Sequence, residues 1–287
     1  MIKYKILLLL IILTCVYLYV GKNFHIYIPK NSCNYLCQKD KYNKVKEKGY
    51  FSDKIKIKEY LSENFPHINY AKLLYQTDDP KSLKNISLPE DFVLKNSSGS
   101  RMFQIVKDGK YNINKLIKKS KKFLSITHGE YGYRKIPFLN LKEPHYKYNQ
   151  RKILIEEYIP NTEEFRIMMV KGEILYYEWF RKVSGEGYVI YRANDTEIYR
   201  LDKEWKKLDV CYGDEEKKNI PIEKPKYFEK INQFCYDFFE KNDFNLMRID
   251  LLLNETDFYF GEITFTPRNC RYPYLDSFDK KFEHLFA

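Results

Sequence analysis

The stretch Met247–Pro267 reads MRIDLLLNETDFYFGEITFTP and is the most informative segment of the 287-residue chain. Two apolar runs, 247–253 and 258–265, flank the polar residues Asn254–Asp257, which predicts two strands joined by a turn. Charged side chains interrupt both runs. The pattern therefore predicts an antiparallel pair of strands that carries polar groups in an otherwise apolar sheet.

Four polar side chains of this segment are expected to share one face. Arg248 and Asp250 are two residues apart on the first strand, and Glu262 and Thr264 have the same spacing on the second. Two carboxylates beside an arginine are costly to bury unless a cation neutralises them. Because Mg²⁺ takes one or two protein carboxylates plus substrate phosphates, the pattern indicates a magnesium site. The alternative is an ion pair of Arg248 with Glu262 or Asp250 on an exposed sheet face.

The rest of the chain alternates between helical and extended patterns. Together these patterns predict an α+β fold, and no helix-turn-helix, zinc-finger or RNA-recognition pattern is present in the sequence. Strands are expected at 71–76, 152–159, 164–170 and 172–180, and a turn followed by a strand at 88–95. Helices are expected at 56–64, 113–126 and 225–244.

The charge is unevenly distributed along the chain. The 50 Lys and Arg against 39 Asp and Glu give a net charge of +11. Residues 1–150 hold 28 basic and 12 acidic side chains, whereas residues 151–287 hold 22 and 27. A basic half suggests an anionic partner such as phosphate, a membrane surface or nucleic acid, and the absence of nucleic-acid-binding patterns disfavours the last. The alternative is the codon usage of an AT-rich genome, since 40 of the 50 basic residues are Lys.

The N-terminus predicts attachment to a membrane. Ile6–Val20 contains no charged residue and is flanked by Lys5 and Lys22, which favours a single-pass anchor over residues 1–22. A cleaved signal peptide is the alternative, although no small-residue cleavage site follows. Residues 23–50 are polar and Lys-rich and are expected to form a stalk. The nearly balanced flanking charge leaves open which side of the membrane the domain faces.

Cysteines and glycosylation motifs bear on the compartment. Cys33 and Cys37 form a C-x3-C pair, which suggests a local disulfide in an oxidising lumen. No second Cys or His pair at zinc spacing accompanies it. Four N-x-[ST] motifs begin at residues 85, 96, 194 and 254.

Two weaker signals lie in the first half of the domain. Lys95 precedes the Ser/Gly loop 96–100, where an ammonium group and free backbone amides suit phosphate, although a solvated strand end is the alternative. The strand 153–159 reads ILIEEYI and contains two consecutive acids. Its backbone is suited to bind a purine, and an exposed polar face is the alternative.

Taken in order, these segments resemble the ATP-grasp superfamily, and within it the TupA-like family of teichuronopeptide biosynthesis. The resemblance runs from Asp53 to Pro267 and is most specific in its last motif. Its motifs are DK at 53–54, LPEDFVLK at 88–95, KEPHYKY at 142–148, ILIEEYI at 153–159, EFRIMM at 164–169, RIDLL at 248–252 and GEITFTP at 261–267.

The resemblance implies a fold and a set of site residues. The fold is an ATP-grasp domain over residues 51–287, with two α/β lobes that sandwich the nucleotide. Lys54, Lys95 and Arg166 would contact phosphate, Ser98, Gly99 and Ser100 would cover it, the backbone of Glu156 to Ile159 would bind adenine, and Glu164 would bind ribose. Arg248 and Lys95 would be catalytic, and Asp250, Glu262 and Thr264 would hold Mg²⁺.

The resemblance also implies a reaction. Such an enzyme uses ATP and Mg²⁺ to activate a carboxylate as an acyl phosphate, which an amine then captures. The carboxylate and the amine stay open, and the family name implies a glycan acceptor. The loop KNSSGSR at 95–101 departs from the family's approximate KPNHGSG, so a catalytically degenerate binding protein is one alternative. The other is a glycosyltransferase-related or glycan-modifying protein with a metal-bound nucleotide-sugar.

Overall fold

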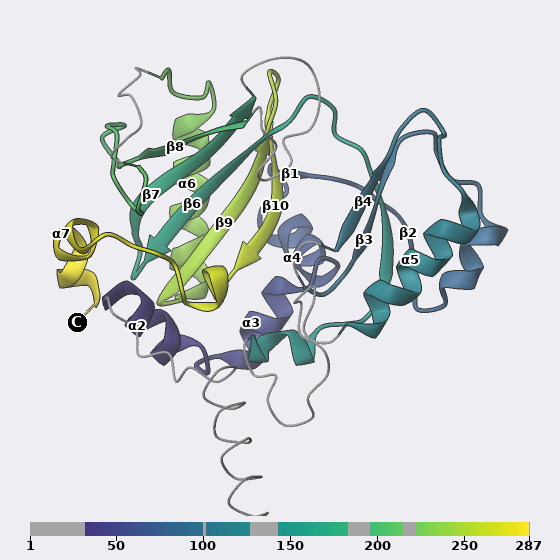
Figure 1. Ribbon diagram of the computed structural model, residues 1–287, viewed down its shortest axis with the longest axis horizontal. Helices are drawn as coiled ribbons and strands as arrows, with labels where there is room; N and C mark the ends of the chain where they lie inside the picture. The colour runs from purple at the N-terminus through teal and green to yellow at the C-terminus, as the bar shows by residue number, and fades with distance from the viewer. Residues whose placement is uncertain (1–31, 100–101, 127–142, 183–195, 215–221, 287) are drawn as a thin grey trace, which may run out of the picture.

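The chain folds around two β-sheets that lie side by side (Figure 1). The computed structural model describes residues 32–99, 102–126, 143–182, 196–214 and 222–286. Within these residues the larger sheet has the strand order β1-β10-β9-β6-β7-β8 and the smaller one β2-β5-β3-β4. The strands are β1 (Asn69–Tyr70), β2 (Leu73–Thr77), β3 (Phe92–Asn96), β4 (Phe103–Val106), β5 (Ile153–Glu157), β6 (Glu163–Val170), β7 (Glu173–Lys182), β8 (Thr196–Leu201), β9 (Leu246–Leu253) and β10 (Phe258–Thr264).

Helices connect the strands and cover the sheets. Because both element types alternate along the chain, the expected mixed α and β architecture is confirmed. The helices are α2 (Ser32–Asp40), α3 (Val45–Ser52), α4 (Lys56–Asn64), α5 (Ile113–Ser125), α6 (Phe228–Asn242) and α7 (Asp276–Phe286), with 3-10 turns η1 (Pro80–Asn85), η2 (Pro144–Tyr148) and η3 (Pro267–Asn269).

The hairpin expected from the sequence forms as β9 and β10. The two strands are antiparallel, and Glu262 lies opposite Asp250 while Thr264 lies opposite Arg248. The register shifts between Phe260 and Glu262, which marks a β-bulge at Gly261. The four predicted polar side chains are therefore brought together.

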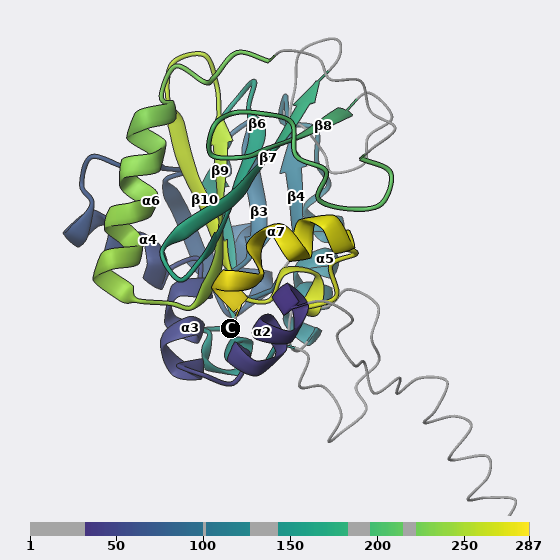
Figure 2. The ribbon, with the colours of Figure 1, turned by 90° about the vertical axis from the view of Figure 1, so that its left-hand side faces the viewer.

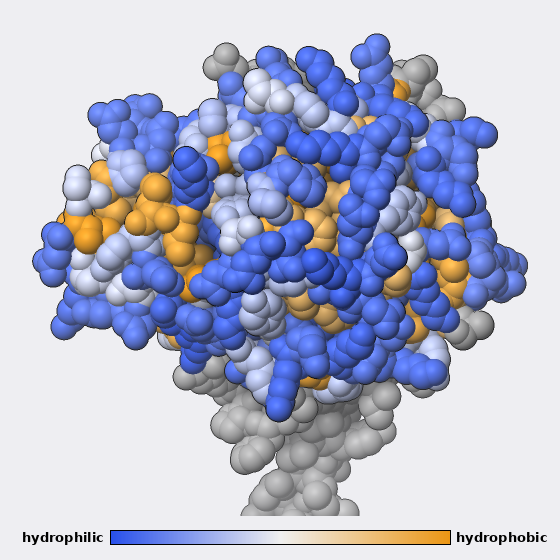
Figure 3. Space-filling view, turned by 180° about the vertical axis from the view of Figure 1, so that it is seen from behind, coloured by the Kyte–Doolittle hydropathy of each residue, from blue (hydrophilic) through white to orange (hydrophobic). Residues whose placement is uncertain are grey.

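One face of the large sheet is apolar and is covered by α6 (Figure 2). Phe234 and Phe238 of α6 belong to the same core cluster there as Phe165 and Ile249, because alternate residues of β6 and β9 point to this side. Figure 3 shows that the rear of the molecule is mostly hydrophilic, with hydrophobic side chains gathered toward the side of the four-stranded sheet. The polar residues of β6, β9 and β10 occupy the opposite face of the large sheet.

The smaller sheet has its own core. Phe92 and Leu94 of β3 pack against Leu116 and Phe123 of α5. The helix buries these apolar side chains and leaves most of its lysines exposed, as the sequence pattern predicts.

The stalk prediction is wrong for residues 32–50. These residues form α2 and α3, and Cys33 and Leu36 of α2 join a core with Phe278 of α7. The helices are short and polar, so their few apolar residues give no clear periodic signal. Residues 23–31 lie outside the described residues.

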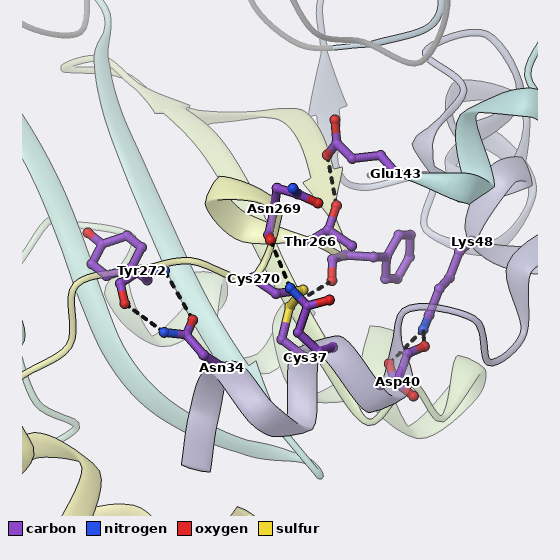
Figure 4. Close-up of a disulfide and its surroundings, with 11 residues drawn as sticks. Asn34, Cys37, Asp40, Lys48, Glu143, Thr266, Asn269, Cys270 and Tyr272 are labelled. Carbon is purple, nitrogen blue, oxygen red and sulfur yellow. Dashed lines mark hydrogen bonds and ion pairs between the residues drawn. A yellow bond between two sulfur atoms is a disulfide. The ribbon is translucent and has the colours of Figure 1, made fainter. Parts of the chain in front are cut away.

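The predicted pairing of Cys33 with Cys37 is also wrong. Cys37 is bonded to Cys270, 233 residues away in the sequence, and Cys33 is buried and free (Figure 4). Cys33 and Cys37 both lie on α2, and Cys270, the partner of Cys37, lies in the segment that follows β10. Next to the disulfide, the Asn34 side chain donates to the Tyr272 carbonyl at 2.7 Å and accepts from its N–H at 3.0 Å.

The predicted anchor over residues 1–22 lies outside the described residues. Within the described part of the chain, no helix combines the length and apolar character needed to cross a membrane. Among the glycosylation motifs, Asn85 is exposed, whereas Asn96 is buried and donates to the Phe123 carbonyl.

Candidate functional site

A row of charged side chains crosses five strands of the large sheet. The strand register places Arg200 of β8, Glu178 of β7, Arg166 of β6, Asp250 of β9 and Glu262 of β10 opposite one another in sequence. The signs alternate from Arg200 to Asp250, so each charge has an opposite neighbour. The face opposite α6 is therefore an ionic surface, and this surface contains the metal ligands expected from the sequence.

Asp250 is buried and ion-paired. Its carboxylate accepts from Arg248 Nε at 2.6 Å and Nη2 at 2.5 Å, and Arg166 Nε lies 3.7 Å away. Burial raises the pKa of Asp250 in spite of these arginines. Arg248 Nη2 also donates to Thr264 Oγ1 at 3.3 Å. The expected alternative, an Arg248–Asp250 ion pair, is thus present, but Asp250 is only 5% exposed.

Lys54 joins the turn between α3 and α4 to strand β10. Its ammonium group lies 3.2 Å from Glu262 Oε2 and donates to the Gly99 carbonyl at 2.9 Å. Burial raises the pKa of Glu262, but Lys54 and Arg248 outweigh it and lower the pKa. One lysine thus connects the loop after β3, a predicted phosphate-covering loop, with a predicted metal ligand.

The buried carboxylate of Asp53 organises the turn that carries Lys54. Asp53 Oδ1 accepts from the Ile55 N–H at 2.9 Å, and Oδ2 accepts from the Gln150 N–H at 2.6 Å. A carboxylate in this position satisfies free N–H groups at the start of α4. This contact explains the aspartate of the DK motif.

Lys95 lies in a second ionic cluster beside the first. Its Nζ is 2.6 Å from Glu156 Oε2, and Lys58 pairs with the other oxygen of the same carboxylate. Burial raises the pKa of Glu156, but Lys95 and Lys58 outweigh it and hold the pKa at about 2. Glu156 is 1% exposed, and its hinge neighbour Ile159 is also buried. Lys58 was not among the site residues expected from the sequence, and it contacts Glu156 across 98 residues.

The Ser/Gly loop starts as expected. Ser98 is buried and its N–H donates to Asn96 Oδ1 at 3.3 Å. Gly99 has a φ of 90°, a backbone conformation that residues other than glycine rarely adopt. Ser100 and Arg101 lie outside the described residues.

Glu164 and Arg166 contact each other. Glu164 Oε1 accepts from Arg166 Nε and Nη2, both at 2.8 Å, and burial raises the pKa of Glu164. Arg166 Nη1 donates to Glu178 Oε2 at 3.0 Å. Glu178 and Arg200 were not expected from the sequence, although the residues on either side of each are apolar or aromatic.

The KEPHYKY motif borders the end of β10. Thr266, two residues after β10, donates to Glu143 Oε1 at 2.7 Å, and both side chains are buried (Figure 4). Burial, together with nearby acids that include Glu143 and Glu262, raises the pKa of Tyr146 well above its ordinary value. These contacts place the motif next to the ionic surface.

The donor set fits Mg²⁺ with two protein carboxylates. Within the described residues no group of three or more His, Cys, Asp or Glu side chains is arranged to hold a metal. Asp250 and Glu262 lie directly opposite each other, and their hard oxygens match the usual use of one or two carboxylates with phosphate oxygens. Thr264 adds a hydroxyl on the same face of β10.

A family model described as TupA-like ATPgrasp matches residues 33–287. The chain belongs to the TupA-like ATP-grasp family, which confirms the resemblance noted from its motifs. Proteins with this fold are typically ATP-dependent ligases that use ATP and Mg²⁺. No curated protein matches the chain in sequence.

Solved ATP-grasp ligases are similar to the chain at low identity. A D-alanine–D-alanine ligase from Bacillus anthracis shares 15% identity at a TM-score of 0.47, covering 83% of this chain and 64% of that one. The ligase PsnB, complexed with a phosphomimetic precursor variant, Mg and ADP, shares 9% identity at 0.46, covering 86% and 62%. The ligase from Helicobacter pylori shares 16% at 0.44, covering 82% and 60%. The chain thus spans less than two thirds of each.

Proposed function

We propose that the chain is an ATP- and Mg²⁺-dependent carboxylate–amine ligase. The observation that carries the proposal is the contact of Lys54 with Glu262 at 3.2 Å, where Glu262 lies opposite Asp250. This contact brings a cation suited to bind phosphate next to two carboxylates suited to bind a metal ion, all on one surface. Family membership supports the same reaction class.

The proposed roles follow from the charges on this surface. Asp250 and Glu262, with Thr264 beside them, would hold Mg²⁺, which supplies charge neutralisation on the transferring phosphate. Lys54, Lys95 and Arg166 would bind phosphate oxygens, Ser98 to Ser100 would cover them, the backbone of Glu156 to Ile159 would hold adenine, and Glu164 would bind ribose.

The proposed chemistry has two steps. A substrate carboxylate oxygen attacks the γ-phosphorus of ATP, the bond to the bridging oxygen breaks, and ADP leaves. The amine then attacks the acyl carbon and expels phosphate. Arg248 would stabilise the anionic intermediate, and no side-chain nucleophile is required. The proposal also includes a glycan as the molecule that carries the substrate carboxylate, and attachment of the chain to a membrane through the segment 6–20.

The test is ligand-induced thermal stabilisation of the full-length protein. MgATP at one hundred times its Kd adds about 2.7 kcal/mol of unfolding free energy, which raises the melting temperature by roughly 5 to 10 °C. Asp250→Asn with Glu262→Gln is expected to abolish the shift. The matched control, Asp276→Asn with Glu255→Gln, replaces exposed acids and is expected to keep it.

Two other outcomes decide against parts of the proposal, and a third measurement assigns the compartment. A shift with a UDP-sugar and none with MgATP would indicate a nucleotide-sugar enzyme. A shift with MgATP but no release of ADP with any carboxylate and amine pair would indicate a binding protein. Glycan attachment at Asn85 in cells would place the domain in a lumen, and its absence together with cytosolic labelling would place it in the cytosol.

A further inference from the structure

Glu178 lies between Arg200 and Arg166 in the charged row but outside the proposed ligand set. It is 2% exposed, and its two carboxylate oxygens are used differently. Oε2 accepts from Arg166 Nη1 at 3.0 Å. Oε1 accepts from Arg200 Nε at 2.9 Å and from the Tyr272 hydroxyl at 2.7 Å. The carboxylate therefore links Arg166, a proposed phosphate ligand, to Arg200 and Tyr272, which are not among the proposed ligands.

The contacts of Arg166 depend on this carboxylate. A guanidinium group presents its N–H donors in a rigid planar fork, so fixing one edge fixes the other. With Nη1 held by Glu178, Nε and Nη2 face Glu164, and Nε lies 3.7 Å from Asp250. Burial raises the pKa of Glu178, but Arg166 and Arg200 outweigh the effect of burial and hold the pKa at about 2, which keeps the carboxylate anionic.

Tyr272 fixes Glu178 from the other side. Its backbone is held by Asn34 of α2, and Cys270, two residues earlier, is bonded to Cys37 of the same helix (Figure 4). The hydroxyl that reaches Glu178 therefore comes from an immobilised segment. Arg200 also pairs with Asp214, so it retains a partner if Glu178 loses its charge.

We propose that Glu178 is a positioning residue, which orients Arg166 toward Asp250 and is itself held by Tyr272. The inference rests on the proposed function for its consequence, which is tighter binding of MgATP. Arg166 would contact phosphate, and Glu178 would act only through Arg166.

The first measurement is calorimetric titration of MgATP into the full-length protein. Glu178→Gln is expected to weaken binding about tenfold and Tyr272→Phe about threefold. Because Glu178 acts through Arg166, the double variant Glu178→Gln with Arg166→Gln is expected to bind no more weakly than Arg166→Gln alone. If the loss of affinity in the double variant equals the product of the losses in the two single variants, the inference is overturned. An unchanged affinity in Glu178→Gln would also overturn it.

The control is Glu163→Gln, which removes another ion pair between the same two strands. Glu163 Oε2 on β6 lies 3.3 Å from Arg181 Nε on β7, away from the charged row. This variant is expected to bind MgATP within twofold of the wild type. An equal loss in both variants would mean that any ion pair between β6 and β7 has the same effect, which would also overturn the inference.

The second measurement needs no nucleotide. Phenylglyoxal condenses with accessible guanidinium groups, and peptide mass spectrometry gives the rate at each arginine. Glu178→Gln is expected to accelerate modification of Arg166 several-fold and to leave the rate at Arg181 unchanged. If the wild type fails to bind MgATP, the proposed ligase is wrong, and this rate alone decides the inference. Equal rates at Arg166 in variant and wild type would overturn it.

Discussion

His145 of η2 is a buried histidine next to the end of β10. Its ring is 1% exposed and lies 6.0 Å, centroid to centroid, from the ring of Phe265. Its Nδ1 has no hydrogen-bond partner among the described residues. Burial, followed by the positive charges of Lys48 and Lys41, lowers its pKa to about 3. The folded protein therefore holds this ring neutral well below the pKa of an exposed histidine.

A histidine with a lowered pKa makes stability fall with acidification. The unfolded state takes up a proton near pH 6.5 and the folded state only near pH 3, so the contribution is complete above pH 6.5. It is lost as pH falls, by up to about 1.4 kcal/mol per pH unit. We expect His145→Gln to flatten the wild-type slope of unfolding free energy between pH 6.5 and 4, measured by urea titration. The control His67→Gln replaces an exposed histidine, and equal slopes in His145→Gln and wild type would contradict the prediction.

At the scale of elements, the bulge in β10 lies at Gly261, where the backbones of β9 and β10 approach each other closely. A Cβ atom on Gly261 would lie 2.8 Å from the Asp250 carbonyl oxygen, closer than side-chain carbons approach backbone. Gly261 thus permits β9 and β10 to approach at the position where Asp250 and Glu262 face each other.

We therefore expect Gly261→Ala to separate the two carboxylates. The backbone shift should cost about 1 to 3 kcal/mol of unfolding free energy and weaken MgATP binding at least tenfold. Calorimetry and urea unfolding measure the two effects. The control Gly109→Ala also introduces a Cβ, at a turn with nothing within 4 Å. It should cost stability through its positive φ and leave MgATP binding unchanged, whereas unchanged binding in Gly261→Ala would contradict the argument.

Elements with strong local patterns were predictable from the sequence. The helix expected at 56–64 has those bounds in the structure, and the paired strands around Asn254 form as a hairpin. The short polar helices α2 and α3 were not predictable from the sequence, because their stability depends on packing against distant residues such as Tyr272.

The candidate site was predictable within strands but not across them. The spacing of Arg248 and Asp250 gives their common face, and the hairpin brings Glu262 to them. Neither spacing nor turn chemistry reveals that β6 lies beside β9, since 75 residues separate Val170 from Leu246 along the chain. The ionic partners Glu178 and Arg200 follow only from that strand order.

On the scale of the whole molecule, the uneven charge of the two halves has a structural basis. Lys54, from the basic half, pairs with Glu262 of the acidic half, and Lys58 and Lys95 pair with Glu156. Part of the excess positive charge is thus neutralised at the candidate site, where the two halves meet.

The disulfide is expected to contribute strongly to global stability. Linking Cys37 to Cys270 closes a loop across 233 residues, which in the chain-entropy account stabilises the fold by about 5 kcal/mol. Urea unfolding of Cys37→Ala with Cys270→Ala should show most of this loss. The control is Cys33→Ala, since Cys33 is buried on the same helix but unbonded. A double variant no less stable than this control would contradict the prediction.

The same disulfide makes the chain a covalent ring with two tails. Both sheets lie within the ring between Cys37 and Cys270, and only the first 36 and the last 17 residues lie outside it. A protease that cuts the ring once leaves a single branched molecule of unchanged mass apart from one added water. The two fragments separate on a gel only after a thiol is added, and until then whatever retains the N-terminal tail retains the rest of the chain as well.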